Sequence, residues 1–289
     1  MDKCQGPDRS PKRPRFRMPQ GACDCHAHVF GPQERYPFAA DRNYTPEDCT
    51  ADQYASLLDV LGISRAVLVQ GGPHGTDNRV TVDAIRRLGE RCRGVAVIPS
   101  GLPANERRAL HDAGIRGVRM STVVRGGVGF AHLENLAADC DELGWHMLLH
   151  MHHSDELVEL APRLRNVKAP FVLDHLARVR GDEGVDSVGF RTMMSLLDTD
   201  RCWVKLASLY RLSSQPYPHE DMLPMIHRVV AARPDRMIWG TNWPHPIHKG
   251  PMPNDGDLVD LIPMWVPDPD HQRRMLVANP AALYGFDAN

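Results

Sequence analysis

The sequence lacks the features that mark membrane proteins and nucleic-acid-binding proteins. Its apolar runs all stay short of the ~20 residues that span a bilayer, and 34 Lys and Arg against 36 Asp and Glu give a formal net charge of −2. We therefore expect neither a membrane nor a nucleic acid as a partner. The first twenty residues, MDKCQGPDRSPKRPRFRMPQ, are basic and rich in proline but have no apolar core for a signal peptide. They predict a flexible basic N-terminal tail at 1–20.

A regular framework of cysteine pairs is also missing. The seven cysteines are odd in number and scattered along the chain, which is typical of reduced thiols in a cytoplasmic protein. A glycine-rich phosphate loop is missing as well, because the first predicted strand runs into the segment HVFGPQ. This absence disfavours an open, doubly wound sheet that binds a nucleotide.

Short β-branched or aliphatic runs are present instead, and they alternate with helix-like stretches. Strands that alternate with helices pair in parallel through right-handed crossovers, and eight such units close into a (β/α)8 TIM barrel. A chain of 289 residues suits one barrel, so we predict an α/β fold with a single domain at 21–289. The predicted strands are 22–29, 65–70, 94–98, 117–120, 146–151, 171–175, 203–207 and 237–241.

Polar residues gather where these strands end, and in a parallel barrel the active site lies at the carboxyl ends of the strands. Histidines are the clearest signal, because burying several imidazoles without a task costs desolvation. The candidates are His26, His28, His74, His150 and His175, the arginines Arg119, Arg125, Arg178 and Arg211, and Asn242; Ser208, Tyr210, His245 and His248 also follow strands.

The alternation of side chains along a strand orients the first run, CDCHAH. It predicts that Asp24, His26 and His28 point into the barrel, with Asp24 as a partner of the histidines, and that Cys23 and Cys25 face the helices. A zinc ribbon built on these cysteines is disfavoured, because no second cysteine pair follows.

The four arginines predict an anionic substrate. A guanidinium is a rigid fork that binds carboxylates with two hydrogen bonds. Arg119 lies between Val118 and Met120 at a strand end, which directs its side chain to the barrel mouth. A small substrate with one or two acid groups would suit such a ring of arginines.

Seven segments together resemble the amidohydrolase superfamily, in its branch of lactonases of the 2-pyrone-4,6-dicarboxylate type: DCHAHVFGP, VQGGPHGTDN, GVRM, GWH, VLDHLAR, WGTNWPHP and VANPAALYGF. The similarity covers nearly the whole chain, from Gly21 to Phe286. It implies a barrel that hydrolyses lactones from aromatic or sugar-acid catabolism, without a metal in the pyrone enzymes. By this resemblance His26 and His28 hold and polarise the lactone carbonyl, His175 matches the histidine of strand six, and the four arginines bind carboxylates.

Two residues depart from the pattern of this family. The last strand of the family carries an aspartate, the expected base for water, where this chain has Asn242, and an amide cannot accept the proton. In strand five, His150 stands where the pyrone enzymes have a tyrosine. Metal-dependent relatives use a histidine at this position as a ligand.

Three interpretations of Asn242 stay open. In the preferred one, His175 or another histidine of the rim activates water, Asn242 positions it, and no cofactor is needed. In the second, His26, His28 and His150 hold one divalent metal ion, with zinc as the first candidate, which lowers the pKa of its bound water. With a metal the protein could be a hydrolase or a decarboxylase. In the third, the barrel binds a small acid without turnover, because general-base catalysis worth about 10²–10⁴-fold is lost.

We therefore predict a lactonase-like hydrolase that acts on carboxylic ester bonds. It opens the lactone of a small carboxylated substrate by attack of water, with histidines polarising the carbonyl and activating the water. The arginines, His150 and His74 bind this anionic lactone or carboxylic acid. A homo-oligomer is compatible with the sequence.

Overall fold

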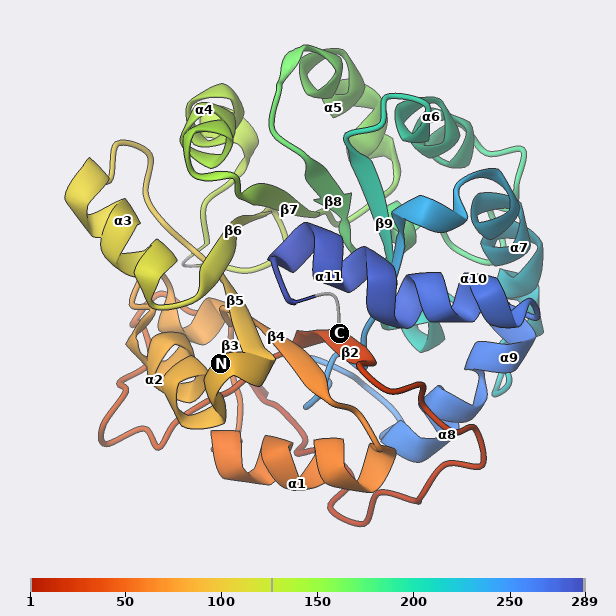
Figure 1. Cartoon of the computed structure of the whole chain (residues 1–289), viewed down its shortest axis with the longest axis horizontal. Coiled ribbons are helices and arrows are strands. Elements are labelled where there is room, and N and C mark those ends of the chain that lie inside the picture. The colour runs from red at the N-terminus through yellow and green to blue at the C-terminus, as the bar shows by residue number, and fades with distance from the viewer. Residues whose placement is uncertain (1, 126, 288–289) are drawn as a thin grey trace.

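The computed structural model describes residues 2–125 and 127–287 of the chain. In this part, eight parallel strands form a nearly closed barrel with the helices around it (Figure 1), which confirms the predicted (β/α)8 architecture. Around the barrel the strands follow one another in chain order. They are β2 (Cys23–Ala27), β4 (Arg65–Val69), β5 (Cys92–Ala96), β6 (Ile115–Ser121), β7 (His146–His150), β8 (Phe171–Leu173), β9 (Cys202–Leu206) and β10 (Met237–Trp239).

Each of the first seven α-helices connects one barrel strand to the next. The first of them shows how the sequence sets its ends: the Thr50 side chain accepts a hydrogen bond from the Gln53 backbone N–H, and Gly62 ends the helix at φ 72°. These helices are α1 (Ala51–Leu61), α2 (Arg79–Leu88), α3 (Ala104–Asp112), α4 (Leu133–Leu143), α5 (Asp155–Asn166), α6 (Val188–Leu197) and α7 (Leu223–Ala232). After β10 follow α8 (Asp255–Asp260), α9 (Ile262–Trp265), α10 (Pro269–Arg273) and α11 (Asn279–Tyr284).

The barrel interior is filled by a cluster of its own, in which residues of seven of the eight barrel strands meet. Its members are Cys23, Cys25, Val67, Val69, Val95, Leu148, Val172, Trp203 and Ile238, with Tyr284 and Phe286. The prediction that the two cysteines face the helices was therefore wrong, and so was the inward direction of Asp24, whose carboxylate reaches Tyr54 of α1. The reason is that the pairing of β2 with β4 shifts register between Asp24 and Ala27, which breaks the simple alternation.

The barrel closes between its first and last strands through backbone hydrogen bonds near the carboxyl ends of both strands. The Asn242 N–H donates to the His26 carbonyl at 2.7 Å, and the His28 N–H donates to the Trp243 carbonyl at 2.7 Å. We call these two bonds the seam. They place two predicted site segments side by side.

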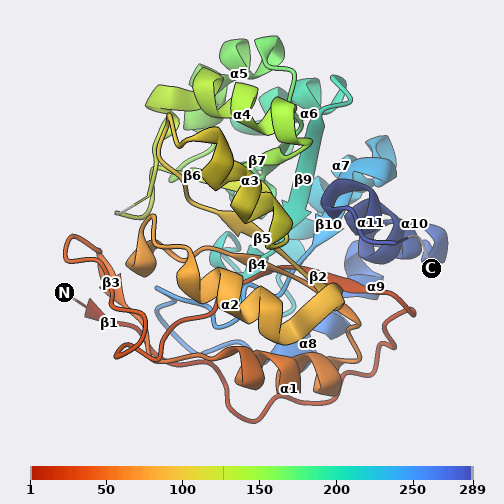
Figure 2. The same cartoon turned by 60° about the vertical axis from the view of Figure 1, so that its left-hand side comes forward.

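The C-terminal segment covers the end of the barrel at which the strands begin. Arg65 and Arg93, near the starts of β4 and β5, donate from their guanidiniums to the backbone carbonyls of Asp287 and Gly285. Figure 1 shows α11 lying across this end, and Figure 2 shows the small sheet of β1 (Asp2–Lys3) and β3 (Tyr44–Thr45) at the opposite end. The carboxyl ends of the strands thus lie at the end of the barrel opposite α11.

The N-terminal segment lies along α8. The Lys12 backbone N–H donates to Asn254 Oδ1 at 2.9 Å, and Lys12 Nζ lies 2.7 Å from Asp257. A Cβ at position 256 would lie 2.1 Å from the Lys12 carbonyl oxygen, so only a glycine fits there. The flexibility expected for residues 1–20 stays a prediction.

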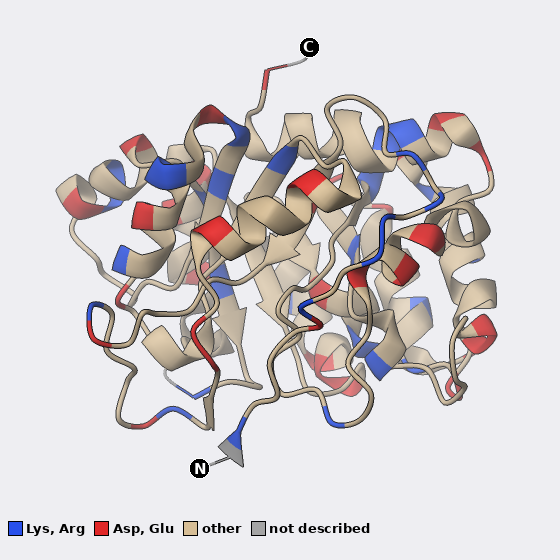
Figure 3. Ribbon diagram, turned by 90° about the horizontal axis from the view of Figure 1, so that it is seen from below, with Lys and Arg blue, Asp and Glu red and all other residues tan. Residues whose placement is uncertain are grey.

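Charges of both signs are spread over the helices and loops (Figure 3), as the small net charge leads one to expect. Among residues 2–125 and 127–287, no helix has both the length and the apolarity that crossing a membrane requires.

Candidate active site

Polar side chains converge at the carboxyl ends of the barrel strands, and most of them are buried. His26 and His28 come from β2 and the residue after it, Arg119 from β6, and His150 from β7. The short 3-10 segment η4 (Asp174–Arg178) follows β8 and supplies His175. The structure thus brings together most of the side chains that the sequence singled out.

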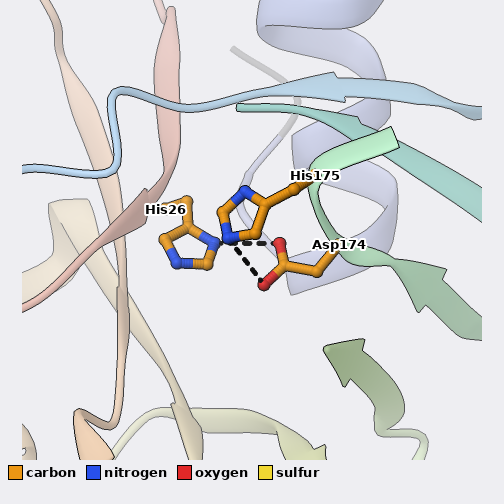
Figure 4. Close-up of side chains that lie close together, drawn as sticks. All are labelled: His26, Asp174 and His175. Carbon is orange, nitrogen blue, oxygen red and sulfur yellow. Dashed lines mark ion pairs between the residues drawn. The ribbon is translucent and has the colours of Figure 1, made fainter. Parts of the chain in front are cut away.

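A buried carboxylate lies between two of the predicted histidines (Figure 4). Asp174 Oδ1 lies 3.1 Å from His26 Nδ1, and Asp174 Oδ2 lies 3.4 Å from His175 Nε2. Burial alone would raise the pKa of Asp174, but His175, His26 and Lys205 hold this pKa well below its ordinary value. Asp174 is therefore an anion at the centre of the site.

Lys205 of β9 lies beneath these groups and is fully buried. Its Nζ is 3.3 Å from His26 Nδ1 and 3.7 Å from Asp174 Oδ1. Burial lowers the pKa of Lys205 and the charge of Asp174 raises it, so that the ammonium and the carboxylate stabilise one another. Neither residue was among the predicted site residues, although Lys205 is the one charged residue of the run WVKLA.

The hydrogen bonds fix the protons on His28 and His26. A carbonyl can only accept, so His28 Nδ1 donates to the Val69 carbonyl at 2.7 Å. Burial, followed by Arg119, lowers the pKa of His28 to about 3, so the ring is neutral and its Nε2 accepts from His26 Nε2 at 3.2 Å. The unprotonated His26 Nδ1 then accepts from the Lys205 ammonium, which also offsets the nearby charge of Asp174 Oδ1. The ring N–H groups of this pair are thus used within the protein.

The contacts of His150 differ from those of His26 and His28, because, among the residues that the structure describes, they leave its Nε2–H free to donate to a ligand. Arg119 Nη2 lies 2.9 Å from His150 Nδ1, and a guanidinium can only donate, so Nδ1 accepts and the ring carries its proton on Nε2. Arg119 also donates from Nη1 to the Gln70 carbonyl at 3.1 Å. In this pair a guanidinium and an imidazole N–H lie side by side, which suits an anionic oxygen.

The other predicted substrate-binding residues lie in different surroundings. Arg178 is partly buried and donates to the His152 carbonyl, and Arg211 donates from Nη2 to the Pro246 carbonyl at 2.5 Å. Arg125 is exposed. His74 is buried between the rings of Phe30 and Phe38, and burial lowers its pKa to about 4. The structure thus brings Arg119 into the buried cluster, but not Arg125.

Asn242 is buried at the seam, with a left-handed backbone (φ 67°) that asparagine and aspartate adopt more readily than most residues. Its Nδ2 donates to the hydroxyl oxygen of Tyr210 at 3.2 Å. Tyr210 lies on the short turn η5 (Leu209–Arg211), and its oxygen is also 2.8 Å from His245 Nδ1. His245 Nε2 in turn lies 3.1 Å from Asp255 Oδ1.

The predicted metal ligands His26, His28 and His150 do not form a set of three close donors. Among the described residues, the donor atoms that lie within 4.8 Å of one another as a group belong to His26, Asp174 and His175. The Lys205 ammonium already lies against two of these residues, and a divalent cation would have to approach this positive charge at short range. The ammonium of Lys205 thus opposes a divalent cation at this donor set.

The nearly closed parallel barrel carries histidines, a carboxylate and arginines at the carboxyl ends of its strands, and the comparison with known proteins places it among hydrolases. The chain belongs to the amidohydrolase family, whose model matches residues 23–286. This finding confirms the resemblance drawn from the motifs.

Curated relatives and solved structures are similar over nearly the whole chain. The chain is 40% identical to a 2-pyrone-4,6-dicarboxylate hydrolase of Comamonas testosteroni, over 95% of this chain and 93% of the relative. It is 36% identical to a 4-sulfomuconolactone hydrolase of Rhizobium radiobacter, over 98% and 96%. A probable 2-pyrone-4,6-dicarboxylic acid hydrolase from Acinetobacter baumannii, solved with citric acid bound, superposes with a TM-score of 0.81 at 27% identity, over 92% of this chain and 100% of that one.

Proposed function

We propose that the protein opens the lactone ring of a small substrate carrying one or more acid groups, by attack of water and without a metal ion. One observation carries the proposal: Arg119 is only 4% exposed, and the charge of Asp174 acts on it from beyond ion-pair distance. A buried cation with no carboxylate in direct contact is costly. A substrate carboxylate would supply the missing partner.

The contacts of Arg119 support this role. Its Nε has no hydrogen-bond partner in the described part of the chain, and the neighbouring His150 presents its Nε2–H. A carboxylate that approached the pair could therefore accept from both residues. Arg178 and Arg211 are further candidates for a second acid group.

The relatives support the same substrate class. One is named after a dicarboxylate and another after a sulfonated lactone, and the Acinetobacter structure holds citric acid. All three ligands are small anions.

The chemistry follows from the groups at the rim. Water adds its oxygen to the lactone carbonyl carbon, the carbonyl oxygen becomes an oxyanion, and collapse breaks the ring ester bond. The proton lost by water ends on the ring oxygen, which leaves as a hydroxyl group, and the new acid ionises. The buried positive charges of Lys205 and Arg119 favour the negative charge that develops.

His175, the predicted base, is a weak one in this setting. Its Nδ1 donates to the Ala207 carbonyl at 3.1 Å, and burial, opposed by Asp174, lowers its pKa to about 3. A general base works best with a pKa near the working pH. His175 is thus available to accept a proton, but with little driving force.

A panel of acidic lactones tests the proposal. We expect acid release that a chelator does not abolish, from protein that holds no stoichiometric metal, and weaker binding of dicarboxylates by Arg119→Met. Stoichiometric zinc or manganese together with loss of activity on chelation would establish the metal-dependent hydrolase or decarboxylase instead. Tight dicarboxylate binding without turnover on any lactone would establish the binding barrel.

A further inference from the structure

Several hydrogen-bond donors converge on the hydroxyl oxygen of Tyr210. Asn242 Nδ2 donates to it at 3.2 Å and Ser208 Oγ at 3.3 Å, and His245 Nδ1 lies 2.8 Å away. Asn242 comes from the loop after β10, and Ser208 from the end of β9, so two neighbouring strands contribute. An oxygen that accepts several donors is stabilised as an anion.

A buried carboxylate orients the histidine behind Tyr210. His245 and Asp255 are both fully buried, and a carboxylate oxygen only accepts, so His245 Nε2 donates to Asp255 Oδ1 over 3.1 Å. Asp255 opens α8, along which the N-terminal segment lies. The result is an aspartate–histidine–hydroxyl arrangement with the tyrosine oxygen in the place of the nucleophile or base.

We propose that Tyr210, held by His245 and Asp255, is the general base that activates water in the proposed lactone hydrolysis, in the place of the aspartate that Asn242 replaces. The inference rests on the proposed function. It assigns to Asn242 the role of a donor that stabilises the tyrosine anion.

The surroundings of Tyr210 agree with this assignment. The charged and titratable groups that face it are Arg211 on its own turn, His245 and His248 on the loop after β10, and Asp255 behind His245. Burial would raise the pKa of Tyr210, but Arg211 and His245 bring it to about 8. Burial would lower the pKa of His245, but Tyr210 and Asp255 raise it to about 9. Both shifts favour a tyrosinate beside an imidazolium.

In the proposed step, the tyrosinate oxygen takes one proton from the water molecule as the water oxygen forms its bond to the lactone carbonyl carbon. When the tetrahedral intermediate collapses, the acyl–oxygen bond of the ring breaks. Tyr210 then returns the same proton to the ring oxygen. The tyrosinate is restored, and no oxidant or other reactant is needed.

Tyr210→Phe tests the proposal, because it removes only the oxygen. We expect kcat for an acidic lactone to fall by about 10²–10⁴-fold with KM little changed. His245→Gln should shift the acidic limb of the kcat/KM profile to higher pH, since the tyrosinate loses its cationic partner. Unchanged kcat in Tyr210→Phe, with activity lost in His175→Ala, would overturn the proposal in favour of His175.

A second readout needs no activity and separates this inference from the proposed function. The ultraviolet difference spectrum of tyrosinate, followed with pH for the native protein and for Tyr210→Phe, isolates one of the six tyrosines. We expect one tyrosine to ionise below the ordinary range in the native protein and not in the variant. If that transition is seen but no lactone is hydrolysed, the proposed function fails and the ionised Tyr210 stands. Identical titrations of the two proteins would overturn the inference.

Discussion

The amide of Asn242 donates a hydrogen bond from Nδ2 to the hydroxyl oxygen of Tyr210 over 3.2 Å. This contact gives a donor where the family pattern has an acceptor. It also predicts the effect of replacing Asn242 by aspartate, because a carboxylate could not donate a hydrogen bond to the Tyr210 oxygen.

Asn242→Asp should therefore lower activity near neutral pH. The new carboxylate would remove one donor from Tyr210 and place a negative charge beside it, which raises the pKa of the tyrosine. We expect kcat/KM to fall by about tenfold or more at pH 7, with the acidic limb of the profile moved to higher pH. A rate that instead rises by orders of magnitude would mean that the native protein is an impaired form of the family's enzyme, in which an aspartate at this position is the base.

Lys205→Met should destabilise the fold and impair turnover. Removal of one partner from a buried ion pair leaves Asp174 as an uncompensated charge, at a cost of about 3–5 kcal/mol. Urea unfolding measures this loss, and Lys205→Arg, which keeps the charge, serves as the control. The loss of the ammonium should also let His26, Asp174 and His175 bind zinc more tightly, as calorimetry can show. Unchanged stability in Lys205→Met would contradict the buried pair.

Arg119→Met and Arg125→Met form a matched pair that tests the predicted arginine ring. Arg119 is buried, so its loss should raise KM for an acidic lactone by about 10²-fold, whereas the exposed Arg125 should matter by only a few-fold. Circular dichroism controls for folding. Equal effects of the two substitutions would support the prediction that Arg125 binds substrate.

Acid should unfold the protein in a window set by its buried histidines. Burial lowers the pKa of His28, His146 and His175 to about 3 each, below the ~6.5 of an exposed histidine. The unfolded chain binds more protons in that interval. The stability these groups contribute is therefore complete above pH 6.5 and is lost as the pH falls toward 3, at about 1.4 kcal/mol per pH unit for each histidine.

His146 allows this to be measured away from the rim, since it packs edge-on against Tyr284 at the other end of the barrel, with ring centroids 5.0 Å apart. His146→Met should reduce the slope of unfolding free energy against pH by about one proton. A slope equal to that of the native protein would show that His146 is not buried in its neutral form.

The sequence predicted the barrel well because eight strand-like runs and their helices are local patterns. It predicted the rim histidines for the same reason, since strand ends can be located without knowing what faces them. It failed where the outcome depends on register: the shift between Asp24 and Ala27 reversed the sides of Cys23, Cys25 and Asp24. Lys205 was missed because the sequence does not show that a carboxylate, Asp174, lies close enough to stabilise a buried lysine in an apolar strand.

The role of Asp255 was beyond the reach of sequence patterns. It lies in a proline-rich segment that the sequence shows only as a connection, and its contact with His245 depends on how the loop after β10 folds back. Tyr210 and His245 both stood out as polar residues after strands. Their contact became visible only when the two loops were placed side by side.

The seam of the barrel has a consequence for how this enzyme can change. The bonds that join the first strand to the last also fix the distance between the His26 backbone and Asn242, so a substitution that loosens this closure would disturb folding and reactivity at once. Arg119 and His150 lie on the opposite wall, on β6 and β7. Substitutions on β6 and β7 can therefore change substrate preference while the hydrogen bonds that close the barrel stay intact.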